Sequence, residues 1–377
     1  MSIPARVALF SVTYDPFIGG AEVALKEVCE RLQDFDFELF TARLDKQLPL
    51  HQKIGNIDVY RLGSGSFLDK YLYPFRAAGM AHKHHQAEPY GFMHAYMATY
   101  AGLAAMLFKR RASIPYILTM QSGDSDRFLK LRTWFWLPWY RKIYTNADVI
   151  VAISSWLAER ARKYGYHKEV KIIPNGARLD LFSAPIDPEA RTTLRDSWGA
   201  QDTDTVILTA SRLVRKNGVD VLIDAMSHID DGAVLVIAGD GKERAALAVR
   251  AKKYGKRIRF TGEVDHNTLA HYYNAADVFV RPSRTEGFGN VFIEAMSAGL
   301  PVVATPVGGI VDFIKDNENG LLAQSEYPES VAEKINILAK NKTLRKTIAE
   351  KGKNTAAQYS WERIAAQYEE VYQEIIS

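Results

Sequence analysis

The sequence predicts an α/β protein made of two Rossmann-like, doubly wound domains that face each other across a cleft. The first observation is the length of 377 residues, for which two domains are the usual arrangement. The second is the alternation of short apolar runs with amphipathic stretches, which is typical of βα units. The third is that the runs are apolar on both faces, as parallel strands covered by helices on both sides are.

We expect a strand at each apolar run. Between two groups of runs, residues 181–204 carry two prolines, several aspartates and no strand pattern, so we place the domain boundary there. The predicted domains are 1–185 and 186–360, and 361–377 is expected to be a C-terminal helix that packs back on the first. The runs are 6–12, 37–42, 57–62, 91–96, 115–120, 148–154 and 169–174 in the first half, and 205–210, 233–239, 257–262, 277–283, 301–306 and 320–323 in the second.

Composition and charge narrow the class of protein. Apolar residues make up 47% and charged residues 24% of the chain, as in ordinary globular proteins. The net charge of +4 is small for this length, so we expect no nucleic-acid partner. The single cysteine, Cys29, excludes an intramolecular disulfide and fits a reducing cytosol. No run of about 18 uninterrupted apolar residues exists, so no membrane-spanning helix is expected.

A glycine pair follows the first predicted strand. Gly19 and Gly20 lead directly into an amphipathic helix. Glycine lets a ligand approach the backbone closely, and a helix N-terminus offers free N–H groups to an anion. The alternative is that the two glycines only form a tight strand–helix turn. Without the other motifs, the glycine pair favours this alternative over an anion site.

Two further loops follow strands of the second domain. Arg212 comes directly after the run 205–210, and Lys216 stands four residues later, before Gly218 and a new helix. Two cations at the carboxyl end of a parallel strand suit a diphosphate, whereas the alternative is a solvated basic loop. Gly239 follows the next predicted strand, and its loop is a further candidate phosphate site at the carboxyl end of a strand.

The stretch 283–301 holds two carboxylates eight residues apart. Asn290 is the expected N-cap of a helix from Val291 to Ala298, which places Glu294 in its first or second turn. Because the surrounding helix is apolar, Glu294 needs a partner, and two vicinal hydroxyls of a ribose would serve. Glu286 lies in the preceding loop, where it would reach a sugar hydroxyl. The alternative is that Glu294 forms an ion pair with a basic core residue.

These segments give a specific resemblance over nearly the whole chain. The sequence resembles a family-four retaining glycosyltransferase of the two-domain GT-B fold, most specifically in its second half. The segments that carry the resemblance are the E-x7-E motif from Glu286 to Glu294, "SRLVRKNGVD", "AGDGKER", "FTGEV", "IPNGARLDLF", "AGLPVVATPVGGI", the early Gly19–Gly20–Ala21–Glu22 and the late "SWERIAAQY".

The resemblance implies a role for each matching residue. The first domain would bind the acceptor and the second the nucleotide sugar. Arg212 and Lys216 would hold the donor diphosphate and act in catalysis with Glu286, which would meet the transferred sugar. Glu294 would bind the ribose. The remaining donor contacts would come from Gly19, Gly20, Gly239, Glu263, Val264, Gly287, Phe288, Gly289, Asn290 and Val291. No metal and no cofactor is expected, and no D-x-D motif ends a strand.

The chain departs from the family pattern at three places. Ser211 stands where the family has glycine, and Asn217 stands where it has lysine, so Lys216 is shifted by one position. Gln121 replaces a histidine found in many relatives, which puts a general base there in doubt. Gln121, Asp124 and His94 are the acceptor-side candidates, and for His94 a structural role is the alternative.

The expected function is retaining transfer of a hexose or N-acetylhexosamine. The donor would be a UDP- or GDP-linked sugar, and the acceptor a hydroxyl of a lipid-linked or polysaccharide precursor. Two alternatives stay open: a nucleotide-sugar epimerase on the same fold, and a catalytically silent subunit that binds nucleotide sugar.

One segment bears on where the protein acts. Residues 127–144 hold Trp134, Trp136 and Trp139, half of the chain's six tryptophans, between basic residues. Aromatic rings with basic flanks suit the interface of an anionic membrane, so we expect a cytoplasmic protein that docks peripherally on the inner leaflet. Burial of the same rings in the core is the alternative.

Overall fold

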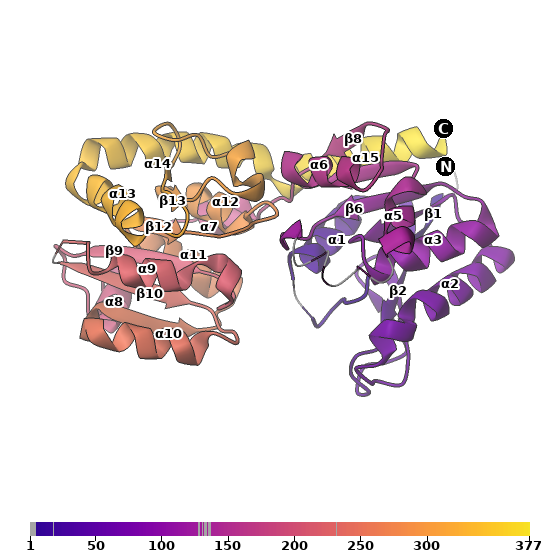
Figure 1. Ribbon diagram of the computed structural model, residues 1–377, viewed down its shortest axis with the longest axis horizontal. Coiled ribbons are helices and arrows are strands. Elements are labelled where there is room, and N and C mark those ends of the chain that lie inside the picture. Colours follow the sequence, from indigo (N-terminus) through magenta and orange to yellow (C-terminus); the bar gives the residue numbers. More distant parts are fainter. Residues whose placement is uncertain are drawn as a thin grey trace. The chain divides into compact units, whose positions relative to one another are not determined.

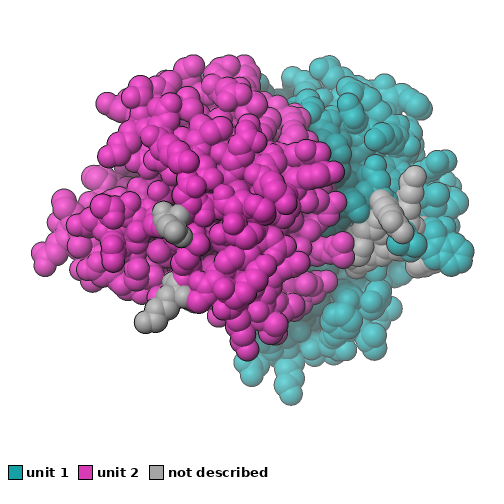
Figure 2. Space-filling model, turned by 60° about the vertical axis from the view of Figure 1, so that its left-hand side comes forward, with its two compact units in different colours: residues 1–175, 361–377 teal, residues 176–360 magenta. Residues whose placement is uncertain are grey.

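The computed structural model describes residues 5–17, 19–126, 129, 131, 134, 137–230 and 232–377. These residues divide into two compact units, coloured separately in Figure 2. The first unit comprises 1–175 and 361–377, and the second comprises 176–360. Within the described ranges, none of the helices combines the length and the apolar character that a bilayer crossing needs.

The first unit is built on an eight-stranded sheet of order β3-β4-β2-β1-β5-β6-β7-β8, parallel except for β3, which pairs antiparallel with β4. Helices lie on both faces (Figure 1): α2 contacts α3, and α1 contacts α15. The strands are β1 (Ala5–Phe10), β2 (Phe35–Ala42), β3 (His51–Ile54), β4 (Ile57–Leu62), β5 (Phe92–Tyr96), β6 (Tyr116–Met120), β7 (Val149–Ala152) and β8 (Val170–Ile172). The helices are α1 (Gly20–Arg31), α2 (Asp69–Ala87), α3 (Tyr100–Ala112), α5 (Leu137–Thr145), α6 (Ser155–Lys163) and α15 (Trp361–Ile376).

The C-terminal helix α15 completes the core of the first unit. Its residues Trp361, Tyr368 and Tyr372 are buried. The Tyr372 ring lies 4.7 Å from that of Phe92 and 5.2 Å from that of Phe35, centroid to centroid. The last helix therefore belongs to the unit that begins the chain.

The second unit has a six-stranded parallel sheet of order β11-β10-β9-β12-β13-β14. The strands are β9 (Thr205–Ala210), β10 (Ala233–Ala238), β11 (Ile258–Gly262), β12 (Val278–Arg281), β13 (Val302–Ala304) and β14 (Leu321–Leu322). The helices are α7 (Leu179–Ser183), α8 (Pro188–Trp198), α9 (Val219–Ala225), α10 (Arg244–Ala251), α11 (His266–Ala275), α12 (Asn290–Ser297), α13 (Pro328–Lys340) and α14 (Lys342–Ala356), with short 3-10 turns η2 (Arg215–Asn217), η3 (Lys252–Arg257), η4 (Gly308–Asp312) and η5 (Ala357–Tyr359).

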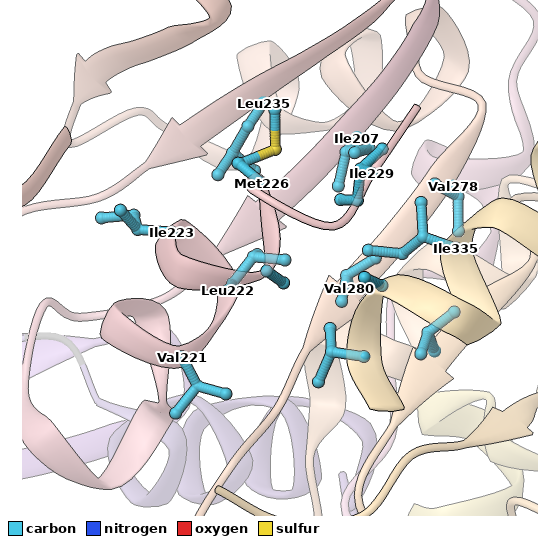
Figure 3. Close-up of a cluster of buried hydrophobic side chains, with 14 of the residues drawn as sticks. Ile207, Val221, Leu222, Ile223, Met226, Ile229, Leu235, Val278, Val280 and Ile335 are labelled. Atoms are coloured by element: carbon cyan, nitrogen blue, oxygen red, sulfur yellow. The ribbon is translucent and has the colours of Figure 1, made fainter. Parts of the chain in front are cut away.

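An aliphatic cluster fills one face of this second sheet. Figure 3 shows Leu222 of α9 and Ile335 of α13 approaching Ile207 and Val280 of the strands. All four side chains are fully buried. Packing of this kind holds the strands in register and so fixes where their carboxyl ends lie.

The units divide at residue 175, ten residues before the predicted boundary of 185. The reason is the short helix α7, which packs on the second unit. Phe182 is buried with its ring 5.7 Å from that of Tyr273, and Ser297 Oγ donates to Leu179 O over 3.2 Å. The segment lacks a strand pattern because it supplies helical contacts to the unit that follows.

Candidate functional site

The candidate site lies at the carboxyl edge of the second sheet. The chain passes from β9 to β10 and β11 on one side and then returns to β12 on the other side of β9. In open parallel sheets, such a reversal of strand order leaves a crevice between the two adjacent strand ends, where ligands bind. The loops that follow β9 and β12 therefore flank the candidate site. They contain Arg212, Lys216 and Glu286.

Glycines let four strand-end loops pack backbone against backbone. A Cβ atom on Gly218 would meet Pro282 O, one on Gly239 would meet Ser211 O, and one on Gly308 would meet Glu286 O, each well inside van der Waals contact. All three glycines have positive φ angles, which other residues adopt only with strain. The loops after β9, β10, β12 and β13 thus form one connected layer.

Arg284 joins the loops after β9 and β12. Its guanidinium donates to both carboxylate oxygens of Asp220 over 2.8 Å and to Arg215 O over 2.7 Å. Its backbone N–H donates to Lys216 O over 2.7 Å. The bond to Asp220 is the main cause that raises the pKa of Arg284 above its usual value. Arg284 was not among the predicted site residues, although its charge inside the motif loop was a signal.

The predicted phosphate residues lie on the loop after β9. Arg212 is exposed, and Lys216 is partly buried in η2. Asn217 is buried and donates from Nδ2 to Arg212 O over 2.7 Å. Asn217, which replaces the expected lysine, therefore closes this loop and places no cation at its position.

Glu286 is held at the loop after β12 by two donors. It forms an ion pair with Arg281, the last residue of β12, and its Oε1 accepts from the backbone N–H of Gly287 over 2.9 Å. Arg281 is buried and was not among the predicted site residues. The signal was a charge at the end of the otherwise apolar run 277–283.

Glu294 is the fifth of the eight residues of α12 and is 8% exposed. Its Oε2 accepts from the Tyr273 hydroxyl over 3.0 Å. Burial raises the pKa of Glu294, and the nearby charges of His266 and Arg281 oppose the shift. The hydrogen-bonding partner of Glu294 is therefore a tyrosine of α11. The alternative interpretation expected a basic core residue in this place.

The start of α12 differs from the prediction. Gly289, with φ of +107°, is the N-cap, and Asn290 is the first helical residue. The Asn290 side chain donates to Gly176 O over 3.4 Å instead of capping the helix. Glycine at positions 287 and 289 leaves these two residues without side chains next to the helix N-terminus, where an anion would bind. Phe288 is buried, and Val291 is partly exposed.

The loop after β11 carries Glu263 and Val264. Glu263 is exposed, and Val264 is partly buried. The loop ends at Asp265, the N-cap of α11, whose side chain accepts from the Thr268 N–H over 2.7 Å. That capping bond lowers the pKa of Asp265. The structure thus orders this loop by its cap and leaves the Glu263 side chain in solvent.

In the first unit, the glycine pair begins α1. Gly19 is its N-cap and Gly20 its first residue. A Cβ on Gly19 would lie 2.5 Å from Glu22 Oε2, whereas one on Gly20 would have no neighbour within 4 Å. Glu22 accepts a hydrogen bond from Thr13. The tip of the Glu22 side chain can move away from such a Cβ, and the φ of Gly19 is −140°, so the turn itself does not require glycine at 19, whereas Gly20 leaves open space beside the helix N-terminus.

The three acceptor-side candidates have different environments. His94 is fully buried in β5, with Nδ1 2.7 Å from the Tyr372 hydroxyl and Nε2 2.7 Å from Thr119 Oγ1. Burial lowers its pKa to about 3. This position favours the structural role for His94. Gln121 and Asp124 are partly exposed on the loop after β6.

Arg160 orders that loop after β6. It is buried and donates to Ser122 O over 3.1 Å, to Asp124 O over 2.6 Å and to the Asp126 carboxylate over 2.9 Å. Gln121 Oε1 accepts from Asn175 Nδ2 over 3.0 Å. Gln121 and Asp124 therefore stand on a braced loop at the carboxyl edge of the first sheet.

The predicted membrane segment 127–144 lies partly outside the described residues, which omit Trp136. In its described part, Tyr140 and Tyr144 are buried against Tyr164, as the core interpretation expects. Trp134 and Trp139 are exposed, as the membrane interpretation expects. The described part of this segment thus contains both kinds of environment.

Two family models match the chain. The model described as "Glycosyl transferase 4-like domain" covers residues 19–176, and that described as "Glycosyl transferases group 1" covers 190–355. An uncharacterized glycosyltransferase of Methanocaldococcus jannaschii is 30% identical over 97% of both chains.

Solved structures are similar over almost the full length. Sucrose-phosphate synthase of Thermosynechococcus elongatus is 25% identical, covers 98% of both chains and has a TM-score of 0.85. The HepE protein of Anabaena, crystallised with UDP-glucose, is 21% identical with a TM-score of 0.81, over 98% of this chain and 100% of its own.

Proposed function

Because the chain belongs to the group 1 glycosyltransferases and has their GT-B fold, we propose that it transfers a hexose or N-acetylhexosamine, with retention, from a UDP- or GDP-linked sugar to a hydroxyl acceptor. The observation that carries this proposal is the connected layer of loops at the switch point of the second sheet. It combines Arg212 and Lys216 with a glycine-capped helix N-terminus and the carboxylates Glu286 and Glu294. The UDP-glucose complex of HepE supports a nucleotide-sugar donor.

In this proposal the site acts by positioning and by charge stabilisation. Arg212 and Lys216 neutralise the diphosphate as its bond to the sugar breaks. The free N–H groups at the start of α12 bind the same anion. Glu294 accepts hydrogen bonds from the ribose, and Glu286 binds a hydroxyl of the sugar. The departing phosphate takes the acceptor proton, so no side chain of the site serves as the general base and no metal is needed.

The test begins with a thermal-shift screen of UDP, GDP, ADP and their sugars. A ligand present at about 100 times its dissociation constant stabilises the fold by roughly 2.7 kcal/mol. The best donor is then incubated with a panel of hydroxyl acceptors, and the anomeric configuration of the product is read by NMR. A glycoside with the donor's configuration supports retention, and an inverted product contradicts it.

The same assay separates the other functions. An isomerised nucleotide sugar formed from the donor alone would identify an epimerase. Donor binding without turnover over the whole acceptor panel would identify a silent binding subunit. Either result would overturn the transferase proposal.

The acceptor that we propose is lipid-linked, and an apolar stripe on the first unit supports this choice. Five large exposed side chains recur at helical spacing over residues 67–75, and the opposite side of α2 is buried. The Lys70 ammonium lies 3.2 Å from the centroid of the Phe67 ring. Exposed aromatic and aliphatic groups beside a cation suit a lipid headgroup region. The stripe consists of Phe67, Leu68, Tyr71, Leu72 and Phe75.

Liposome sedimentation tests this docking. We expect binding to anionic vesicles at low salt that weakens at high salt and is lost when Phe67, Leu68 and Phe75 are replaced together by serine. The matched control replaces Val249 and Val311, two exposed apolar residues of the second unit, by serine. Equal binding by both variants, or no binding by the wild type, would contradict the membrane proposal and favour a soluble acceptor.

A further inference from the structure

A buried arginine connects the end of a core strand to the candidate sugar site. Arg281 is the last residue of β12, and its side chain is only 7% exposed. The other three residues of the strand are Val278, Phe279 and Val280. An unpaired charge in such surroundings would cost several kcal/mol, so a buried arginine is retained only where its partners compensate for desolvation.

Three contacts fix the Arg281 side chain. Nη2 forms the ion pair with Glu286, and Nε donates to Ser283 Oγ over 3.1 Å. The guanidinium also lies over the Phe292 ring of α12, 5.1 Å from its centroid. Ser283 is itself anchored, because its carbonyl oxygen accepts from the Thr305 hydroxyl over 2.5 Å. The planar group therefore has one orientation, set by β12, its loop and α12 together.

Two fixed donors consequently bind the Glu286 carboxylate, which can still accept further hydrogen bonds. Arg281 binds one carboxylate oxygen, and the Gly287 N–H binds the other. An ionised carboxylate offers about four acceptor positions, so it can still accept hydrogen bonds from a ligand. Its orientation is thus set before any ligand arrives, which lowers the entropic cost of an aligned contact.

We propose that Arg281 is the positioning residue of the sugar site: it orients the Glu286 carboxylate so that this group discriminates the hydroxyl configuration of the transferred sugar. The inference rests on the proposed function, in which Glu286 meets that sugar. It assigns Arg281 no contact with the nucleotide. Losing Arg281 should therefore impair turnover and sugar discrimination while nucleoside diphosphate binding persists.

The variants Arg281→Met and Arg281→Lys test this role against a matched control, Arg195→Met. Arg195 is also a buried arginine of the second unit, where it pairs with Asp277 over 2.9 Å. Asp277 lies just before β12, so this pair is at the opposite edge of the sheet from the site. The control reports what the loss of a buried arginine does to the fold alone.

Three measurements separate positioning from stability. Calorimetry gives the affinity for the nucleoside diphosphate, steady-state kinetics give kcat and KM, and kcat/KM for two donor sugars epimeric at one carbon gives the discrimination ratio. For Arg281→Met we expect diphosphate affinity within about threefold of wild type, kcat lower by about 100-fold, and a ratio that approaches one. Arg281→Lys should recover part of kcat, since it restores the charge without the planar fork. Arg195→Met should keep the wild-type ratio.

The outcomes distinguish this inference from the function on which it rests. Wild-type transfer with an unchanged ratio in both Arg281 variants would overturn the inference and leave the function standing. An Arg281 variant that loses diphosphate affinity and kcat equally would also overturn it, since the residue would then act on the nucleotide or the fold. A wild-type protein that binds no nucleotide sugar would remove the function and the inference together. If Arg281→Met does not fold, Arg281→Lys decides by the same ratio.

Discussion

Glu294 is buried in α12 beside the Tyr273 hydroxyl, whereas Glu286 lies in the preceding loop between Arg281 and the Gly287 amide. Replacing Glu294 and replacing Glu286 should therefore impair different steps of the reaction. Glu294→Gln should weaken binding of the free nucleoside diphosphate by about 1.5–3 kcal/mol, because the ribose belongs to the nucleotide. Glu286→Gln should leave that binding almost unchanged and reduce kcat. Calorimetry and kinetics check both, and equal loss of diphosphate affinity in the two variants would contradict the assigned roles.

Arg212 is the simplest test of the phosphate contact. Its side chain is exposed on the loop after β9, and its backbone carbonyl supports the loop by accepting from Asn217 Nδ2 and from the Val214 N–H. Arg212→Ala should therefore leave the thermal midpoint unchanged and reduce kcat/KM by at least the roughly 10- to 100-fold that a lost charge-assisted bond represents. Asn217→Ala is the useful contrast, since it should lower stability as well. Wild-type kcat/KM in Arg212→Ala would remove this residue from the site.

His94 makes stability depend on pH in a defined window. Its folded pKa is about 3, below the ordinary value of 6.5. Above pH 6.5 the residue is neutral in both states and costs nothing. Below it, the unfolded chain binds a proton that the folded chain does not, so stability falls as the pH drops from 6.5 towards 3. At pH 5 the loss is about 2 kcal/mol.

Urea unfolding of the wild type and of His94→Gln, at pH 7.5 and pH 5, measures this effect. Glutamine can still donate and accept hydrogen bonds but does not titrate. The stability advantage of the wild type over the variant should therefore shrink by about 2 kcal/mol at the lower pH. An advantage that stays constant would mean that His94 is accessible to protons in the folded protein.

At the scale of elements, the loops of the site depend on each other's backbone. Gly239 has φ of +126°, and a side chain there would collide with Ser211 O. Gly239→Ala should displace the loop after β9 and reduce nucleoside diphosphate affinity along with stability. Gly255→Ala is the control, because Gly255 also has positive φ, +58°, but open space around it. It should cost about 1–3 kcal/mol of backbone strain, because its φ of +58° and ψ of −128° suit glycine alone, but it should leave the loop after β9 in place. Donor affinity lowered equally in both variants would contradict the packing argument.

The elements that the sequence predicted share a property that the missed ones lack. The apolar runs predicted the buried strands of both sheets because burial on two faces demands such runs. The strand β3 (His51–Ile54) was missed because it is an edge strand with three exposed side chains and no apolar run. The N-cap of α12 was assigned to Asn290 by residue type, but the backbone needed positive φ one position earlier, at Gly289.

The candidate site was predictable where a residue type alone suggests its chemistry. Arg212, Lys216, Glu286 and Glu294 were singled out because cations and carboxylates at strand ends suit a phosphate and a sugar. Arg281 and Tyr273 were not singled out. Arg281 matters because it is buried beside Glu286, and Tyr273 matters because it contacts Glu294, which is distant in sequence. A charged residue that ends an apolar strand is a signal for the first. At Tyr273, the sequence pattern predicts only an ordinary core residue of a helix.

At the scale of the whole molecule, the predicted family and fold class are confirmed. The division at residue 175 rather than 185 was not predicted, because proline and aspartate content marks the absence of a strand and does not reveal which unit the helix α7 packs on. The assignment of 361–377 to the first unit has a direct test by truncation.

Removal of residues 361–377 should unfold the first unit. Trp361, Tyr368 and Tyr372 are buried there, and the loss of one such aromatic side chain costs about 3–5 kcal/mol, so the loss of three is as large as the whole stability of a typical domain. Limited proteolysis with mass spectrometry should show cleavage within residues 5–175 and protection of 176–360. Truncation after Gln373, which removes exposed or half-buried residues, should preserve the full protease resistance. A resistant first unit in the longer truncation would show that α15 is dispensable.

The place of α15 also sets an order of events during synthesis. The strands of the first unit leave the ribosome before the second unit, but the helix that covers Phe35 and Phe92 leaves it only after all of 176–360. At about 5–20 residues per second, this interval lasts on the order of ten to forty seconds. The second unit is therefore complete while the first still exposes an aromatic surface, a natural target for chaperones. Synthesis thus completes the second unit before the first.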